Sequence, residues 1–119
     1  YDWCWGDDHQ WLYDMANDMM TYSHDHGYYL PPGGARWTVE QMKKDIDKPH
    51  PLAMTANGIS SGAWNKVANR LEEISKEQIA EILRKIPKSW PVADEELEGL
   101  GYLLDRRRVS VAERLRGKA

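Results

Sequence analysis

Residues 61–87 read SGAWNKVANRLEEISKEQIAEILRKIP and contain two successive patterns of an amphipathic helix. In the first pattern, apolar residues recur at the three- and four-residue spacing of one helical face. That face consists of Trp64, Val67, Ala68, Leu71 and Ile74, and Ser60 or Ser61 can cap the helix. Ser75 and Gln78 then form a capping box, which predicts the start of a second helix. Its apolar face consists of Ile79, Ile82, Leu83 and Ile86. Helices of this kind bury their apolar faces against one another, so the segment predicts a helical core.

The same helix signals continue on both sides of this segment. Upstream, Thr38 with Gln41 has the capping-box pattern and predicts another helix start. Downstream, Asp94 can cap a helix, and Ser110 with Glu113 repeats the capping pattern and predicts a further helix start. The predicted fold class is therefore mainly α, a bundle of four or five helices with short connections.

The first part of the chain has a different pattern, which changes at the Pro-Pro-Gly-Gly sequence of residues 31–34. Residues 10–13 and 20–25 are rich in β-forming side chains, and a turn can form between them, so we predict a short β-hairpin. A helix over residues 10–20 is the alternative interpretation. An isolated hairpin is marginally stable in water. We therefore expect it to pack on the helices or on a partner.

Charge is distributed unevenly along the chain. Residues 1–35 contain six Asp and no Lys or Arg, whereas residues 36–119 contain all 16 basic residues and 13 of the 19 acidic ones. We predict a single domain over residues 1–119, in which 1–35 form an acidic hairpin segment and 36–119 a helical bundle. The basic run of residues 106–108 fits a solvated helix face, so nucleic acid is not an expected partner.

Hydropathy and cysteine content restrict the class of protein further. No apolar run approaches the roughly 20 residues that a membrane helix needs, so no membrane partner is expected. Cys4 is the single cysteine, which excludes an internal disulfide framework and a zinc site built from cysteines. A reducing, cytoplasmic location is the expectation from this cysteine content.

Two acidic clusters carry the side chains that can support chemistry. They read GDDHQ at residues 6–10 and HDHG at residues 24–27, and they lie at the two ends of the predicted hairpin. Antiparallel pairing brings those ends together, so Asp7, Asp8, Gln10 and Asp25 can share one site. Carboxylates with a carboxamide are hard oxygen ligands and suit magnesium.

Strand alternation leaves two metal sites open at this point. In a regular strand, the side chains of residues 24 and 26 point one way and that of residue 25 points the other. Either Asp25 binds magnesium, or His24 and His26 bind a metal such as zinc, manganese or iron. The first option predicts phosphate chemistry, and the second predicts hydrolysis or redox chemistry.

The order of these motifs is similar to that of protein kinases. There, an acidic loop precedes a hairpin, and Asp-x-Gly follows its second strand. Residues 22–30, YSHDHGYYL, resemble the Asp-His-Gly variant of the HipA-like protein kinase family, and residues 34–38, the following helices and the Arg-rich last helix also look like that family's C-terminal lobe. The resemblance implies a helical bundle like a kinase C-terminal lobe, preceded by a short hairpin.

The resemblance also implies roles for particular residues. Asp25 and Gln10 would bind Mg²⁺ on the phosphates of ATP, and Asp7 would be the catalytic aspartate, with His9 matching the His of the family's Asp-Arg-His pattern. The sequence departs from that pattern in two places. Asp8 replaces the Arg, and Leu12 stands where the metal-binding Asn is expected. Gln10 serves as the amide only if the loop is two residues shorter than in the family.

Kinases also grip ATP with an N-terminal lobe that carries a Gly-rich loop and a strand Lys. No Lys or Arg precedes Arg36 in this chain. We therefore expect an N-terminal lobe or a partner chain to complete the enzyme, a protein substrate, and no activity from the chain by itself. Some members of the broader family act in bacterial toxin–antitoxin systems. The alternatives are a non-catalytic helical interaction module and a His/Asp metal-dependent hydrolase that uses His24 and His26.

Overall fold

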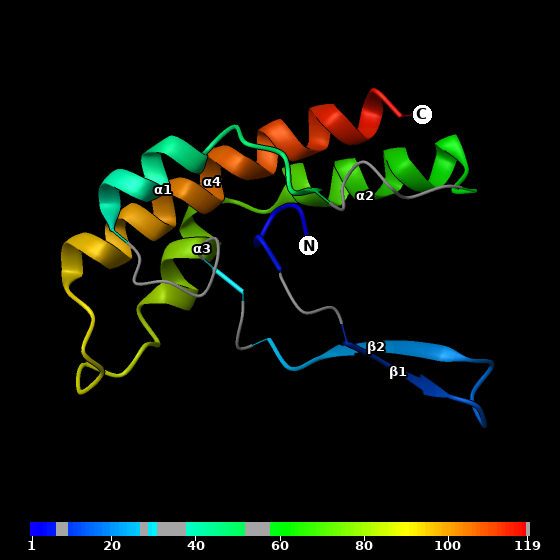
Figure 1. The fold of residues 1–119 in the computed structure, drawn as a ribbon, viewed down its shortest axis with the longest axis horizontal. Helices are drawn as coiled ribbons and strands as arrows, with labels where there is room; N and C mark the ends of the chain where they lie inside the picture. Colours follow the sequence, from blue (N-terminus) through cyan, green and yellow to red (C-terminus); the bar gives the residue numbers. More distant parts are fainter. Residues whose placement is uncertain (7–9, 27–28, 31–37, 52–57, 119) are drawn as a thin grey trace.

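The computed structural model describes residues 1–6, 10–26, 29–30, 38–51 and 58–118. Within these residues a two-stranded antiparallel sheet precedes four helices, as Figure 1 shows. The elements are β1 (Gln10–Asp14), β2 (Met20–His24), α1 (Val39–Asp45), α2 (Ser61–Glu73), α3 (Lys76–Leu83) and α4 (Asp94–Arg116). The predicted mainly helical fold with an N-terminal hairpin is confirmed.

Hydroxyl side chains cap the first three helices, as their sequence patterns predict. The Thr38 hydroxyl accepts a hydrogen bond from the backbone N–H of Gln41 at 3.1 Å, and that of Ser60 accepts one at 3.3 Å from Ala63. At α3, Ser75 and Gln78 form both hydrogen bonds of the capping box. Each cap satisfies a backbone N–H that the first turn of a helix leaves without a partner.

The fourth helix differs from the prediction in its length and in its cap. It runs without a break from Asp94 to Arg116, so the predicted separate helix at Ser110 is wrong. The Ser110 hydroxyl donates to Asp47 Oδ1 at 2.8 Å, which is a tertiary contact, and does not cap a new helix. The N-cap of α4 is Ala93 and not Asp94 as predicted. The backbone N–H of Ala93 donates to the Glu96 carboxylate at 2.7 Å.

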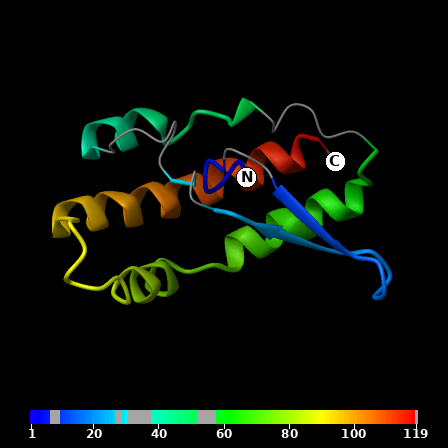
Figure 2. The ribbon, with the colours of Figure 1, turned by 60° about the horizontal axis from the view of Figure 1, so that its bottom comes forward.

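The long α4 is the spine of the bundle, because α1, α2 and α3 all pack against it (Figure 2). Two groups of buried side chains lie along its length. The first contains Met42, Ile79, Leu100, Leu103 and Leu104, and the second contains Ala68, Leu71, Val111 and Ala112. The Trp3 side chain packs against both groups and donates its indole N–H to the Leu104 carbonyl at 2.9 Å. The N-terminal segment is therefore part of the core.

Some residues of the predicted apolar faces are exposed instead of buried. Ile82 is 64% exposed and Val67 is 50% exposed, although both fit the helical spacing. Trp90, in the connection between α3 and α4, is also 61% exposed. In the described part of the chain, α2 and α3 pack on α4 and on no other helix. One covering helix buries only a narrow stripe of each face, so the edges of the predicted stripes remain in solvent.

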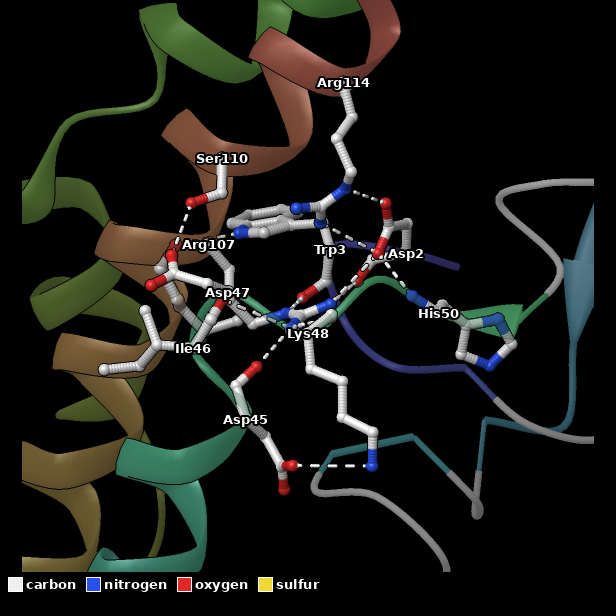
Figure 3. A network of polar contacts seen from close by, with 11 residues as sticks. Asp2, Trp3, Asp45, Ile46, Asp47, Lys48, His50, Arg107, Ser110 and Arg114 are labelled. Atoms are coloured by element: carbon white, nitrogen blue, oxygen red, sulfur yellow. Dashed lines mark hydrogen bonds and ion pairs between the residues drawn. The ribbon is translucent and has the colours of Figure 1, made fainter.

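A buried arginine joins the N-terminal segment to the helices, as Figure 3 shows. The Arg107 side chain is 1% exposed and lies among backbone carbonyls from two parts of the chain. Its guanidinium donates to the carbonyls of Asp2, Trp3, Asp45, Ile46 and Lys48, and also to the Asp2 carboxylate. The prediction that residues 106–108 form a solvated helix face is therefore wrong for Arg107, the middle residue of the run. Burial lowers the pKa of Arg107, and the nearby Asp2 carboxylate opposes that shift.

Asp2 is the second member of this network and holds the start of the chain in place. Its carboxylate accepts from Arg107 at 3.0 Å and from Arg114 at 3.1 Å, and it also accepts the backbone N–H of His50 at 2.9 Å. His50 is 2% exposed and its ring meets that of Trp5 edge to face, so it is buried within its loop. These contacts fix the segment from which the hairpin extends.

The hairpin itself projects away from the helices (Figure 1). Its register pairs Gln10 with His24 and Asp14 with Met20, which excludes the alternative of a helix over residues 10–20. No helix of the described chain lies against either strand, so the expected packing on the helices is not found there. Seven large apolar side chains of the hairpin are exposed: Trp11, Leu12, Tyr13, Met15, Met19, Met20 and Tyr22. Among the helices that the structure describes, none is long and apolar enough to span a bilayer.

Candidate functional site at the open end of the hairpin

The open end of the hairpin brings together two of the side chains predicted to bind metal. Gln10 begins β1 directly opposite His24, the last residue of β2. Asp25 follows with a φ of 55°, a left-handed conformation that ends the strand. In this position its Oδ2 accepts a hydrogen bond from Gln10 Nε2 at 3.3 Å. The predicted meeting of Gln10 and Asp25 is thus confirmed.

The left-handed conformation of Asp25 also changes the argument from strand alternation. That argument required a regular strand through residue 26, but the strand ends at His24. Asp25 turns toward the side chain of Gln10, whose backbone pairs with that of His24. The carboxylate therefore reaches the open end because the backbone leaves the sheet geometry, and not because of alternation along the strand.

His26 belongs to a separate group of contacts beside the sheet. Its Nε2 lies 2.8 Å from the Ser23 hydroxyl, and its ring meets the Tyr29 ring edge to face at 4.7 Å. The Tyr29 ring in turn packs against Tyr1, and Tyr1 packs against Trp11 at 5.2 Å. These rings form an aromatic cluster of Tyr1, Trp11, His26 and Tyr29 that joins the hairpin to the first residue of the chain. Neither Tyr1 nor Tyr29 was among the predicted site residues.

Burial changes the acidity of two groups near the site. It raises the pKa of the Tyr29 hydroxyl, and the hydrogen bond from Ser23 acts in the opposite direction. Burial also raises the pKa of the Cys4 thiol against the opposing effects of the N-terminal ammonium and Arg107. Cys4 packs against the larger core group, as expected for a small apolar side chain. A raised pKa disfavours the thiolate, which is the form of cysteine that acts as a nucleophile.

Gly6 permits the close packing of the aromatic cluster. A Cβ atom at this position would lie 2.5 Å from Tyr1 Cδ1 and 2.7 Å from Tyr29 Cζ, well inside van der Waals contact. The backbone N–H of Gly6 also donates to the Tyr1 carbonyl at 3.0 Å and closes a tight turn. Only a residue without a side chain fits between the two rings.

Gly6→Ala is therefore expected to separate the two tyrosine rings and to lower the free energy of unfolding by about 1–3 kcal/mol. Near-ultraviolet circular dichroism and urea unfolding would measure both effects. Gly62→Ala is the matched control, because a Cβ atom there has no neighbour within 4 Å. That variant should keep its aromatic signal and should not lose stability, because alanine is a better helix former than glycine and Gly62 lies in α2. An unchanged aromatic signal in Gly6→Ala would contradict the packing of this cluster.

The remaining predicted site residues divide into two groups. Asp7 and His9, the predicted catalytic pair, lie outside the residues that the structure describes. His24 and His26 lie inside them, but residues 1–6, 10–26, 29–30, 38–51 and 58–118 contain no group of three His, Cys, Asp or Glu side chains arranged to hold a metal ion. The described part of the site is thus the exposed Gln10–Asp25 pair beside the aromatic cluster.

Comparison of this chain with protein-family models, with curated proteins and with solved structures gives no match.

Proposed function

We propose that this chain is the C-terminal lobe of a HipA-like serine/threonine kinase, which transfers phosphoryl groups from Mg-ATP only when an N-terminal lobe or a partner chain completes it. The contact between Gln10 and Asp25 is the observation that supports this proposal most directly. It places a carboxamide and a carboxylate at the end of the hairpin where the resemblance puts the two metal-binding side chains. The helical bundle behind the hairpin agrees with the lobe that the resemblance implies.

The donor set at this position fits magnesium. Asp25 is exposed and offers a carboxylate, and the amide oxygen of Gln10 is a second hard ligand once the side chain rotates. Two protein ligands leave most of the coordination positions for water and phosphate oxygens, which is how Mg²⁺ is commonly held at phosphate-binding sites. When bound, the ion would neutralise charge on the nucleotide phosphates. In the same proposal Asp7 positions and deprotonates the substrate hydroxyl.

The exposed hairpin supports the second half of the proposal, that another lobe completes the site. Large apolar side chains on both strands are about half exposed, including Leu12 at 54% and Tyr22 at 48%. Large exposed apolar patches commonly mark surfaces that another protein covers. A kinase N-terminal lobe would supply that cover together with the phosphate-binding groups. The proposed cellular location of the completed enzyme is cytoplasmic, in line with its cysteine content.

Metal binding by four proteins provides the first test: the natural chain, Asp25→Asn, a His24→Ala/His26→Ala double variant and Asp18→Asn. We expect weak Mg²⁺ binding, on the order of millimolar, because phosphate oxygens normally complete the coordination. Asp25→Asn should abolish this binding, and the double variant should keep most of it. Asp18→Asn removes the same charge from the turn at the other end of the hairpin and should bind like the natural chain. Isothermal titration with Mg²⁺ and Zn²⁺ measures all four.

Two results would contradict the kinase proposal. Tight zinc binding that requires both His24 and His26 would indicate the metal-dependent hydrolase instead. Magnesium-dependent ATP hydrolysis by the purified 119-residue chain would show that no further lobe is needed, because phosphoryl transfer depends on positioning and charge stabilisation that the proposal assigns to that lobe.

The exposed hairpin also favours a second candidate, a non-catalytic interaction module. In this interpretation the aromatic and acidic hairpin binds a partner directly, and Asp25 contributes surface charge only. It predicts that none of the four proteins binds Mg²⁺, while substitution of Leu12 and Tyr22 by serine weakens partner binding. The metal titration therefore separates the two candidates.

A further inference from the structure

A groove of about 770 Å³ lies between α3 and α4, on a part of the molecule distinct from the hairpin. Apolar side chains from both helices and from the connection between them line its floor: Ile79, Leu83, Ile86 and Leu97. Gly101 allows the two helices to approach closely, because a Cβ atom there would lie 3.1 Å from Leu83 Cδ1. Figures 1 and 2 both show α3 beside the first half of α4.

The two walls of this groove carry opposite charge. Three basic residues lie on the α3 side and in the connection that follows it: Lys76, Arg84 and Lys88. Three acidic residues lie on the α4 side: Asp94, Glu98 and Asp105. Glu77 is the one acidic residue on the basic wall. Among the described residues, Asp105 pairs with Arg108, while the other six wall charges, Glu77 included, form no ion pair. The groove therefore presents a basic edge and an acidic edge whose charges are still available.

An exposed aromatic side chain stands on the rim of the groove. Tyr102 lines the groove and is 54% exposed. It also borders a second hollow of about 370 Å³ between α4 and α1. A two-fold axis along the groove would set the α4 wall of each copy, and with it Tyr102, against the α3 wall of the other copy. Tyrosine is also one of the residue types enriched at protein interfaces.

We propose that the α3–α4 groove is a dimer interface between two copies of this chain, related by a two-fold axis that runs along the groove. This axis places the basic α3 wall of one copy against the acidic α4 wall of the other, twice. A two-fold axis across the groove would place like walls together, and repulsion between like charges opposes that arrangement. The charge pattern therefore selects both the partner and the orientation.

A second copy fits this groove better than an unrelated partner because the groove has a basic edge on one side and an acidic edge on the other. An unrelated partner would need an acidic edge and a basic edge at the same spacing and in the reverse order. A second copy has both edges by symmetry, as any isologous interface does. The interface is independent of the proposed kinase function, since neither Gln10 nor Asp25 lines the groove.

Charge reversal on the two walls tests the interface. In Arg84→Glu, the new glutamate would face Glu98 of the other copy, so two negative charges would meet. In Glu98→Arg, the new arginine would face Arg84 of the other copy, so two positive charges would meet. Each variant should dimerise at least about tenfold more weakly than the natural chain, because every dimer contains the repulsion twice. An equimolar mixture of the two variants should recover the dimer, since both contacts then pair opposite charges. Sedimentation equilibrium measures the dissociation constants.

Charge reversal at exposed sites outside the groove provides the control. Lys66→Glu on α2 and Glu113→Arg on the second half of α4 make the same changes in net charge, and both should dimerise like the natural chain. Far-ultraviolet circular dichroism checks that every variant remains folded. A natural chain that stays monomeric at millimolar concentration would overturn the proposal. So would a dimer that the groove variants do not weaken, or a variant mixture that does not recover dimerisation.

Discussion

Replacing Arg107 by methionine should lower the free energy of unfolding by about 3–5 kcal/mol, a large part of the stability of a domain this size. Methionine keeps an unbranched apolar stem but removes every donor of the guanidinium. The carbonyls of Asp2, Trp3, Asp45, Ile46 and Lys48 then lose the partner that they share. Buried acceptors without a partner cost far more than an ordinary exposed hydrogen bond contributes.

The neighbouring residue provides a control for this experiment. Arg106 is exposed on the same helix, so Arg106→Met should change the free energy of unfolding by less than about 0.5 kcal/mol. The loss of stability in Arg107→Lys should fall between those of the two methionine variants, because one ammonium cannot reach all the carbonyls that a planar guanidinium contacts. Urea unfolding followed by circular dichroism measures all three variants. Equal stability of the two methionine variants would contradict the network in Figure 3.

The Arg107 substitution should also loosen the hairpin, since the arginine holds the backbone of Asp2 and Trp3 against the helices. The backbone next to Tyr1 is then held less firmly, which weakens the contact between the Tyr1 and Trp11 rings. Limited proteolysis should therefore cut the N-terminal segment faster in Arg107→Met than in Arg106→Met, under conditions where both remain folded.

Leu71→Asp should unfold the domain, with a loss of more than about 4 kcal/mol. Leu71 is 9% exposed and packs with Ala68, Val111 and Ala112 where α2 meets α4. An aspartate there would place a carboxylate among apolar groups without a cation to pair with it. The expected result is the loss of helical circular dichroism at room temperature.

Ile82→Asp makes the same chemical change at a residue that belongs to the same kind of sequence pattern. Ile82 is 64% exposed, so this variant should stay folded and lose less than about 1 kcal/mol. Thermal unfolding of the two variants compares them directly. Unfolding of Ile82→Asp, or a stable Leu71→Asp, would show that the packing of α2 and α3 on α4 is not as described.

The local features of this protein follow from its sequence because their causes lie within a few residues. The caps of α1, α2 and α3 depend on a hydroxyl and a backbone N–H three residues later. The hairpin depends on two short β-forming runs around a turn. Antiparallel pairing then requires the ends of the hairpin to meet, which is why the contact between Gln10 and Asp25 could be predicted.

Features that depend on distant contacts could not be predicted from the same patterns. The spacing that places Ile82 on an apolar face contains no information on which helices cover that face. Ser110 follows the capping pattern, but Asp47 lies within reach of its hydroxyl, and α4 continues through it. Likewise, nothing near Asp25 in the sequence shows that its backbone would leave the strand.

The basic run at residues 106–108 shows most clearly which features the sequence predicts and which depend on tertiary contacts. Sequence alone established a helix there with charged side chains, and the exposed Arg106 agrees with that prediction. Only the tertiary structure decided that Arg107 is buried, because its partners are carbonyls contributed by residues 2–3 and 45–48. Every residue has a backbone carbonyl, so no sequence motif marks these acceptors. Their convergence depends on how the N-terminal segment and the loop after α1 pack on α4.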